Sequence, residues 1–565
     1  MSDSSSDEDI LPTIISSSSK DKVHIKHPGV SSPIKSQYAT LSKNPKWPDD
    51  LWDSGTLIYK IYHNDKPGKG NEKLLRFDSR FESGNLDQVY HLGGNAYHCI
   101  LEYDKNKTGS CQWFYFKIMG VKADTKYHFY ISGFHKNTGV FATGSKVFWY
   151  SEKVFMNKGI SWNRGGSNYS YGNTQKRNRK RTTLQFYIKF PYDDDTVYLS
   201  YAIPYTYTDL LDNIKIWSDM APPGSFSVKS ICKSLGGRDC PMITITSENS
   251  STPMSNKPGI LLTSRIHPGE SNGSVVLHGL IDFLVSRTFY ADFLRNNYVI
   301  YIVPMINIDG VIEGFYRISL SGQDLNRVWD SPDSNINPEA FFTKEFFHRV
   351  SRERTIAAYL DFHGHSRLHG TFAYGCPNTA NTDLINREKY FPRILSYLCD
   401  VFSWSGCIFS FPKERKAASR IVIRTELDVV NSFTIETSFG GINNGERTGI
   451  LYDELTWKEI GLKCGESLYH LLYSSKSPVY NYVSQEMLFL SPPQIDDDIP
   501  EKERIDYIVS PIPNDSDFPQ TFNHPTHLLK LKPPSNYLIA NSRIISTKSP
   551  GYCAPKWVSL KFGEN

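Results

Sequence analysis

From about residue 205 to residue 475, short apolar runs alternate with segments whose apolar residues recur at helical spacing. This alternation is typical of an α/β fold with a mostly parallel sheet and helices on both of its faces. The apolar runs cover residues 260–266, 298–306, 356–362 and 433–435, and helical spacing follows at residues 274–287 and 454–473. In such sheets ligands bind beyond the carboxyl ends of the strands. We therefore expect a site where the runs end, at His267, Glu270, His363 and Glu436.

The flanking segments differ in composition. Residues 1–45 are rich in Ser, Lys, Asp and Pro without a sustained period, which predicts a disordered N-terminal segment. Residues 46–204 carry short aromatic or alternating runs separated by turn residues, which suits an antiparallel sandwich or barrel, and we expect a β-sandwich. Residues 205–475 would then form the α/β domain, and the Pro-rich residues 476–565 a C-terminal extension.

The composition excludes several classes of protein. Hydrophobic residues make up 39% of the 565 residues, which is too many for a disordered or collagen-like chain. The longest apolar run, residues 298–306, is interrupted by Pro304 and is far shorter than the roughly 20 residues that cross a bilayer. The chain begins with an acidic, polar stretch rather than a secretory signal. Its nine cysteines form no C-x-x-C pair, which indicates reduced thiols. We expect a cytoplasmic protein.

The net charge gives little indication of partners. It is +4, from 63 basic and 59 acidic side chains, which is too balanced to favour a nucleic-acid binder. We expect neither nucleic acid nor a membrane as a partner.

A pair of potential metal ligands follows the first apolar run. His267 and Glu270 straddle Pro-Gly, and this tight turn can direct an imidazole and a carboxylate at one ion. His363, at the end of another predicted strand, supplies a third ligand, and such a set leaves a fourth position open to water, as in catalytic zinc sites. His365 is a rival for the third position. The alternative is a turn histidine beside a glutamate that caps the next helix.

Five stretches of this region, in this order, resemble the motifs of the cytosolic carboxypeptidases, a subfamily of the zinc carboxypeptidases. They are residues 265–272, 307–317, 322–327, 361–366 and 434–439. Two upstream stretches, residues 77–86 and 201–207, resemble the N-terminal β-domain of that family and its junction with the catalytic domain. The resemblance covers roughly residues 75 to 475.

The resemblance implies a role for each matching residue. His267, Glu270 and His363 match the ligands of one zinc ion, and family precedent favours His363 over His365. Glu436 matches the general base. The remaining matches concern the substrate: Arg317 for the oxyanion, Asn326 and Arg327 for the terminal carboxylate, and Arg420 with Arg424 for the departing side chain.

The implied activity is the removal of C-terminal acidic residues, chiefly glutamate, from protein tails such as those of polyglutamylated tubulin. It implies a cytoplasmic location, with the cytoskeleton or the cilium as possible sites of action. Two alternatives stay open: a zinc amidohydrolase of the aspartoacylase type, which shares the H-x-x-E pair, and a non-catalytic module that binds acidic tails.

Overall fold

The computed structural model describes residues 35–42, 47–48, 50–61, 74–104, 110–176, 179–378 and 386–490. The chain divides into two compact units, residues 1–35 and 36–565, and every described residue except Lys35 belongs to the second. The predicted Pro-rich extension lies outside the described residues from position 491 onward.

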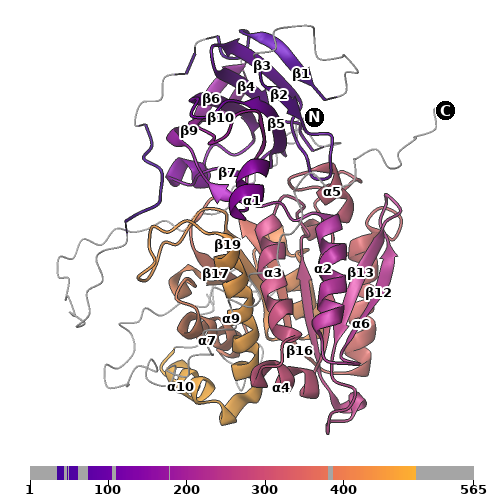
Figure 1. Ribbon diagram of the computed structural model, residues 1–565. Helices are drawn as coiled ribbons and strands as arrows, with labels where there is room; N and C mark the ends of the chain where they lie inside the picture. Colours follow the sequence, from indigo (N-terminus) through magenta and orange to yellow (C-terminus); the bar gives the residue numbers. More distant parts are fainter. Residues whose placement is uncertain are drawn as a thin grey trace, which may run out of the picture. The chain divides into compact units, whose positions relative to one another are not determined.

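Two sheets form an N-terminal β-sandwich (Figure 1). The six-stranded sheet has, in spatial order, β1 (Thr56–Lys60), β3 (Gln88–Gly93), β4 (Ala96–Ile100), β6 (Tyr127–Phe134), β10 (Arg179–Ile188) and β9 (Ser167–Lys176). The five-stranded sheet has β2 (Arg76–Asp78), β5 (Tyr115–Val121), β11 (Asp195–Ser200), β7 (Phe148–Ser151) and β8 (Asn163–Arg164). We call these strands, with α1 (Glu152–Lys158) and the 3-10 helix η1 (Val140–Thr143), the β-sandwich.

The aromatic runs of the sequence form the core of the β-sandwich. Phe77 of one sheet lies 5.5 Å from Tyr97 of the other, measured between ring centroids, and both rings are buried. Along β11, Val197, Tyr198 and Leu199 are all buried in the same core cluster. One detail differs from the predicted antiparallel sandwich: β4 and β6 pair in parallel. That pairing joins strands about 30 residues apart, so no local signal announces it.

An eight-stranded sheet forms the second part of the fold, and its central strands are parallel. Its spatial order is β12 (Phe226–Lys233), β13 (Asp239–Ile245), β15 (Val299–Val303), β14 (Gly259–Ser264), β16 (Ile356–His365), β19 (Ser432–Ser438), β17 (Thr371–Gly375) and β18 (Ile408–Phe409). The pairs β12/β13, β13/β15 and β17/β19 are antiparallel, so the sheet is mixed. The predicted mixed, mostly parallel sheet is confirmed at its centre.

Helices cover both faces of this sheet (Figure 1). They are α2 (Tyr207–Met220), α3 (Ser271–Leu284), α4 (Phe289–Asn297), α5 (Ile308–Glu313), α6 (Pro338–Glu353), α7 (Tyr390–Leu398), α8 (Ser419–Leu427), α9 (Glu454–Tyr473) and α10 (Pro478–Met487). Short 3-10 helices are η2 (Met254–Asn256), η3 (Leu325–Arg327), η5 (Arg387–Lys389), η6 (Trp404–Gly406), η7 (Lys413–Arg415) and η8 (Ser474–Lys476). We call α2 to α10 with the sheet the α/β part.

The continuous apolar run of β14 reflects burial on both sides. Ile260 and Leu262 belong to the core cluster that includes α3 and α9, whereas Leu261 belongs to the cluster of α6 and α8. A parallel strand buried on both faces reads as an unbroken hydrophobic run. Side chains therefore pack on both faces of the sheet at β14, whose carboxyl end leads into the site.

Hydrogen bonds to main-chain atoms join the β-sandwich to the α/β part, and we call this set of contacts the joint. Ser83 donates from its backbone N–H to Ile312 O and from its hydroxyl to Val311 O, and the Asn85 amide donates to Gly314 O. These bonds cap the last turn of α5. Elsewhere Arg164 donates to the carbonyls of Phe439, Gly440 and Tyr452.

Two segments are more ordered than the sequence suggests. Residues 36–42 fall in the segment predicted to be disordered, yet Tyr38 donates to Ile442 O at 2.8 Å and its ring stacks on His369. These contacts explain its order, because burial compensates for the lost entropy. In the predicted extension, α10 packs on α7, and Arg393 holds Glu486 with two hydrogen bonds.

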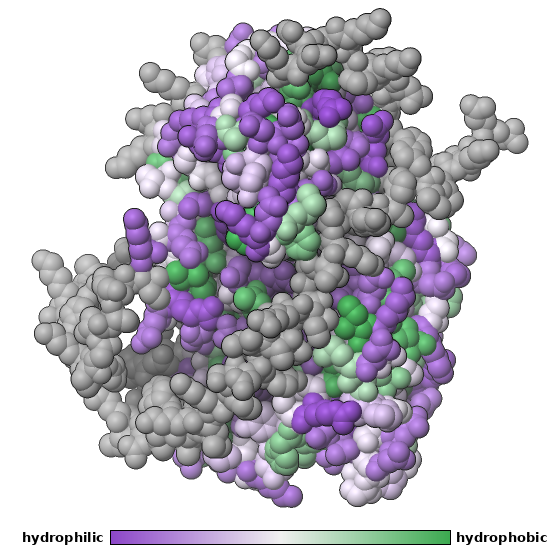
Figure 2. All heavy atoms as spheres, viewed as in Figure 1, coloured by the Kyte–Doolittle hydropathy of each residue, from purple (hydrophilic) through white to green (hydrophobic). Residues whose placement is uncertain are grey.

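Among the described helices, none combines the length with the apolar composition that crossing a bilayer requires. On the face drawn in Figure 2, hydrophilic residues predominate and hydrophobic residues form small separate groups.

Candidate metal centre and active site

A strained turn after β14 brings His267 and Glu270 to one place. Arg265 has a left-handed backbone (φ 59°) and is 1% exposed. Its guanidinium donates to Pro268 O and Tyr205 O, each at 2.8 Å, and these two hydrogen bonds fix the conformation of the turn. Glu270 then takes the N-cap position of α3. A side chain at Gly269 would collide with Tyr316 at 2.8 Å, so the turn needs glycine there.

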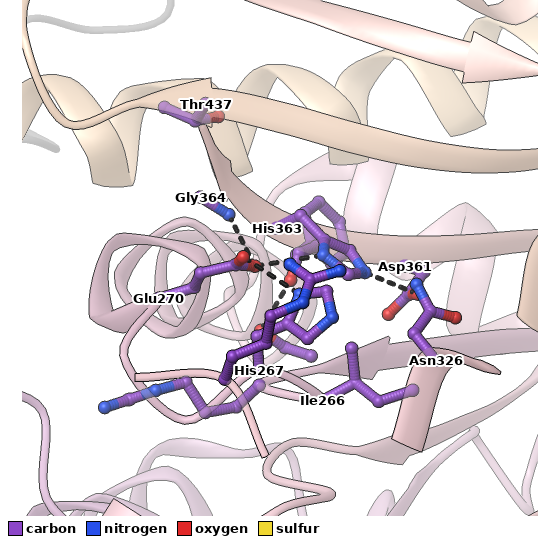
Figure 3. Close-up of polar contacts among 12 residues, drawn as sticks. Ile266, His267, Glu270, Asn326, Asp361, His363, Gly364 and Thr437 are labelled. Carbon is purple, nitrogen blue, oxygen red and sulfur yellow. Dashed lines mark hydrogen bonds and ion pairs between the residues drawn. The ribbon is translucent and has the colours of Figure 1, made fainter. Parts of the chain in front are cut away.

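His267, Glu270 and His363 form one compact group of potential metal ligands. Each offers one ligand atom, and these atoms lie within 4.8 Å of one another. The His267 Nδ1 lies 2.9 Å from Glu270 Oε1, and the His363 Nδ1 lies 3.0 Å from Glu270 Oε2. Figure 3 shows both imidazoles turned toward the Glu270 carboxylate, which also accepts a hydrogen bond from Gly364 N. All three side chains are buried.

The second nitrogen of each imidazole is held by an aspartate. His363 Nε2 lies 2.8 Å from Asp361 Oδ2, and His267 Nε2 lies 3.1 Å from Asp324 Oδ1. Carboxylate partners of this kind fix the tautomer and orientation of metal-binding histidines. Two nitrogens and one carboxylate are a donor set suited to a catalytic zinc ion. The residues present therefore fit zinc.

The charges of this group are tightly linked. Burial alone would raise the pKa of the Glu270 carboxyl, but His267 and His363 hold it well below its usual range. Burial alone would lower the pKa of His363, but Asp361 and Glu270 raise it well above its usual value. In the same way, Arg317 and His267 outweigh the burial of Asp324 and hold its pKa well below its usual range. The site is thus strongly attractive to a positive charge between the ligands.

Glu436 stands beside the metal ligands. It lies on β19, directly opposite His363 of β16 in the parallel register. Burial, with a further contribution from Glu270, raises the pKa of Glu436 to about 7 even though His363 acts in the opposite direction. A carboxyl with a pKa near neutrality is suited to move protons at that pH.

Arg317 lies on the loop that follows α5, and Asn326 and Arg327 lie on η3, which comes next along the chain. The Arg317 Nη2 lies 2.8 Å from Asp324 Oδ2, on the carboxylate whose other oxygen meets His267. Asn326 accepts from Ser419 N through its Oδ1, so its amide nitrogen is the part that can donate to a ligand. Arg327 donates to the carbonyl of Asn326 at 2.9 Å. The loop and η3 thus bring all three residues to the carboxyl ends of β14 and β16.

The two arginines of α8 have different surroundings. Arg420 is 4% exposed, its Nε has no hydrogen-bond partner among the described residues, and its guanidinium lies 5.7 Å from the centre of the Tyr374 ring. Burial lowers its pKa, and the charge of Glu436 partly opposes this effect. Arg424, one turn later, is already bound to Asn378 and Asp428. Arg420 is therefore the better placed of the two to receive an anion.

The rival ligand His365 is turned to other contacts. Its Nδ1 accepts from Leu368 N, and its ring packs against Phe372 at 5.3 Å. Although His363 and His365 are two residues apart on β16, only His363 joins the ligand group found among the described residues.

Three site residues escaped prediction as functional positions. Asp361 and Asp324 stood inside the stretches singled out in the sequence, but nothing in their spacing shows that they meet His363 and His267. Arg415, on η7, acts on Glu436 and Arg420 through its charge. Its only signal was the basic character of residues 413–424.

Comparison with protein families gives two matches. The model of the zinc carboxypeptidases matches residues 218–398, and the model of the cytosolic carboxypeptidase N-terminal domain matches residues 77–201. The first match includes His267, Glu270 and His363 and ends before Arg420 and Glu436.

Curated relatives have related names. The chain is 33% identical over 447 residues to cytosolic carboxypeptidase 1 of Xenopus laevis and 35% identical over 395 residues to cytosolic carboxypeptidase 2 of Danio rerio. These alignments cover 74% and 69% of this chain but only 36% and 55% of the relatives. The match thus spans about a third to just over half of those proteins.

Solved structures share the fold at low sequence identity. A metallo-carboxypeptidase from Burkholderia cenocepacia matches 71% of this chain and 99% of its own, with a TM-score of 0.57 and 19% identity. A metallo-carboxypeptidase from Pseudomonas aeruginosa, solved with (2-guanidinoethylmercapto)succinic acid, matches 70% of this chain and 99% of its own, with a TM-score of 0.56 and 21% identity.

Proposed function

Because the chain belongs to the cytosolic carboxypeptidase family of zinc carboxypeptidases, we propose that it is a zinc-dependent metallocarboxypeptidase that removes C-terminal acidic residues, chiefly glutamate, from protein tails. The observation that carries this proposal is the convergence of His267, Glu270 and His363 directly beside Glu436. One zinc ion per chain would be held by the first three residues.

Bound zinc supplies a Lewis acid that polarises a carbonyl and lowers the pKa of a water molecule to about 7. The residues of the chain do the rest. Glu436 takes a proton from the attacking water and passes it to the leaving amine. Arg317 donates to the oxygen on which negative charge develops.

Binding of the substrate's end falls to Asn326 and Arg327. A guanidinium grips a terminal carboxylate through two parallel hydrogen bonds, which restricts cleavage to the last residue. Arg327 and the Asn326 amide nitrogen come from the same short segment, and this allows them to act on one carboxylate. Their placement supports exopeptidase action.

Preference for glutamate rests on Arg420, with Arg424 as a second cation one turn farther along α8. A buried charge without a partner costs several kcal/mol, so a side-chain carboxylate that pairs with Arg420 would be favoured strongly. The burial of the Arg420 guanidinium, whose Nε has no hydrogen-bond partner in the part of the chain that the structure describes, supports this assignment.

We take polyglutamylated tubulin as the substrate and the cytoplasm as the location, with action at the cytoskeleton or the cilium. The names of the relatives support the cytoplasm. An aspartoacylase-type amidohydrolase is less favoured, since residues 77–201 match the N-terminal domain of cytosolic carboxypeptidases. A non-catalytic tail-binding module would need a missing catalytic residue, and the sequence lacks none of those that the resemblance implies.

The activity is tested by mass spectrometry of a polyglutamylated tubulin-tail peptide before and after incubation with zinc-loaded protein. Stepwise loss of terminal glutamates is expected. Glu436→Gln should still bind zinc but lose about 100- to 10,000-fold of the turnover. Turnover of that variant within tenfold of the parent would show that another group is the base.

Metal content tests the ligand assignment separately. His267→Ala should lose zinc and activity together, whereas His365→Ala should keep the metal. Loss of zinc from the His365 variant and its retention by His363→Ala would reverse these two roles.

Specificity is tested by comparing peptides that end in Glu with peptides that end in Leu. Arg420→Ala should slow release of Glu by on the order of 30-fold or more, as expected for loss of one partner of a buried charge pair, and should spare Leu. Lys416→Ala removes an equal charge from an exposed neighbouring position and is the matched control. Unchanged selectivity of the Arg420 variant would refute the acidic pocket while leaving the peptidase activity standing.

A further inference from the structure

Asp104 of the β-sandwich region grips a piece of main chain that belongs to the α/β part. Its Oδ1 accepts from Tyr316 N at 2.7 Å, and its Oδ2 accepts from Arg317 N at 2.8 Å and from Ile318 N at 3.1 Å. Three successive backbone amides thus converge on one carboxylate. Asp104 is only 3% exposed.

This arrangement is costly for the carboxylate. Burial raises the pKa of Asp104 to about 6 even though the three N–H donors and the Arg317 charge oppose the shift. Buried carboxylates of this kind are tolerated only where hydrogen bonds satisfy them. The amides that do so belong to the segment that carries Arg317.

The same segment is fixed from two other directions. On one side, the carbonyl of Tyr316 accepts from Gly269 N at 2.9 Å, within the turn between His267 and Glu270. On the other side, the Tyr316 hydroxyl lies 3.3 Å from Ser366 Oγ, which also accepts from Lys136 of the β-sandwich at 3.0 Å. The peptide unit between Tyr316 and Arg317 is therefore held at its oxygen by the metal-ligand turn and at its N–H by Asp104. Asp104 also holds the N–H groups of Tyr316 and Ile318.

A short chain of contacts then leads to the metal ligands. Arg317 pairs with Asp324 at 2.8 Å, and Asp324 meets His267 at 3.1 Å. A shift of the Arg317 backbone would move its guanidinium relative to the ligands and to the carbonyl under attack. Displacements near 1 Å can cost about 100-fold in rate.

We propose that Asp104 is a positioning residue for the carboxypeptidase reaction, which holds the Arg317 main chain so that its guanidinium meets the oxyanion. This inference rests on the proposed function. It assigns the β-sandwich a share in building the site, beyond structural support. Asp104 bonds to the main chain of residues 316–318, so it acts on the reaction through the position of Arg317.

The test uses the full chain and the isosteric variant Asp104→Asn, whose NH2 group opposes one of the backbone donors. We expect kcat on a short Glu-terminated peptide to fall about 10- to 100-fold, with KM changed less than kcat and zinc content unchanged. Ser83→Ala is the matched control, because it removes a buried hydrogen bond of the same joint, to Val311 O, without touching residues 316–318. Its kcat should stay at the parent value.

A double-mutant cycle separates positioning from general stabilisation. In an Arg317→Ala background, Asp104→Asn should have little further effect on kcat/KM, because both changes remove the same interaction. An equal fold-loss in both backgrounds would overturn the proposal, as would a kcat of Asp104→Asn at the parent value.

Hydrogen exchange gives a readout that does not depend on catalytic activity. The amides of residues 316–318 should exchange as slowly in the parent as those of β16, and faster in Asp104→Asn. Rapid exchange in the parent would overturn the anchor. If the zinc-loaded parent instead cleaves no peptide while these amides are protected, the proposed function fails and the anchor stands as a structural contact.

Discussion

Glu339 is a buried carboxyl in the first turn of α6 with an oxygen that lacks a hydrogen-bond partner in the described part of the chain. Burial, reinforced by the nearby charge of Asp309, raises its pKa from an ordinary value of 4.5 to about 7. An acid whose pKa is raised on folding stabilises the fold below its unfolded pKa. That contribution is lost as the pH rises through the folded pKa.

Glu339→Gln should therefore stabilise the protein increasingly between pH 5 and pH 8. The gain in free energy of unfolding relative to the parent should approach about 3 kcal/mol at pH 8. Urea denaturation at both pH values measures it. Glu345→Gln, at an exposed position of the same helix, is the control. An equal effect of Glu339→Gln at the two pH values would contradict the assignment.

At the scale of single residues, the sequence predicts what has a local pattern. The spacing of His267 and Glu270 and the position of His363 at a strand end were sufficient to group them. The partnership of Asp324 with His267 was not predictable, because 57 positions separate the two residues and only the loop after α5 brings them together. The effect of the Arg415 charge on Glu436 was likewise not predictable, because the two residues lie on different elements, η7 and β19.

At the scale of elements, α3 and α9 pack with their backbones in close approach. A methyl group at Gly461 would lie 1.8 Å from Val276 O, and one at Gly279 would lie 2.1 Å from Lys458 O. At Gly465 the nearest atom is instead on the Phe283 ring, which can move. The closeness matters for the site, because α3 begins directly after Glu270.

Gly461→Ala should destabilise the protein by about 1–3 kcal/mol or more, as overpacked cores do. This is opposite in sign to the gain of about 1 kcal/mol that alanine brings to an open helix. Gly465→Ala should cost less. Denaturant unfolding of the two variants makes the comparison, and a Gly461→Ala protein as stable as the parent would show that the helices can separate freely.

The element boundaries show where sequence patterns suffice. Helical spacing placed α9 at its observed ends. The predicted helix at 274–287 starts three residues earlier in the structure, because Glu270 provides the N-cap. Strand β16 continues past His363 because its pairing with β19 reaches His365. Helix α10 lies in the segment predicted as a C-terminal extension, although Ser477 and Pro478 form a regular helix start.

At the scale of the whole molecule, Arg164 of β8 donates several of the hydrogen bonds between the β-sandwich and the α/β part. It donates five hydrogen bonds, to Ser145 Oγ and Lys146 O in its own region and to three carbonyls of the α/β part. A lysine has a single nitrogen and cannot reach all of these acceptors. Each buried carbonyl left without a donor costs about 1–3 kcal/mol.

Arg164→Lys should thus lower the free energy of unfolding by about 1–3 kcal/mol or more. Arg447→Lys is the matched control, since Arg447 pairs with Glu459 and Asp400 within the α/β part and is partly exposed, where such changes stay within about 0.5 kcal/mol. Thermal or denaturant unfolding compares the two. Equal effects would mean that the joint adds no particular stability.

The order of the strands within the β-sandwich was the least predictable feature of the fold. Short aromatic runs indicate strands but not their partners, and here residues of β4 pair with residues of β6 that lie 32 positions away. Long-range pairing is decided by packing across the two sheets. The sequence carries that information only in the whole set of core residues.

The joint also determines whether either part could be exchanged for that of another protein. A hydrogen bond between a side chain and a main-chain atom requires that particular side chain and the exact position of the main chain that it meets. Ser83, Asn85, Asp104 and Arg164 all bond to the main chain across the joint. The two parts are therefore not interchangeable one at a time, because a part taken from another protein would leave buried donors or acceptors of the joint unpaired.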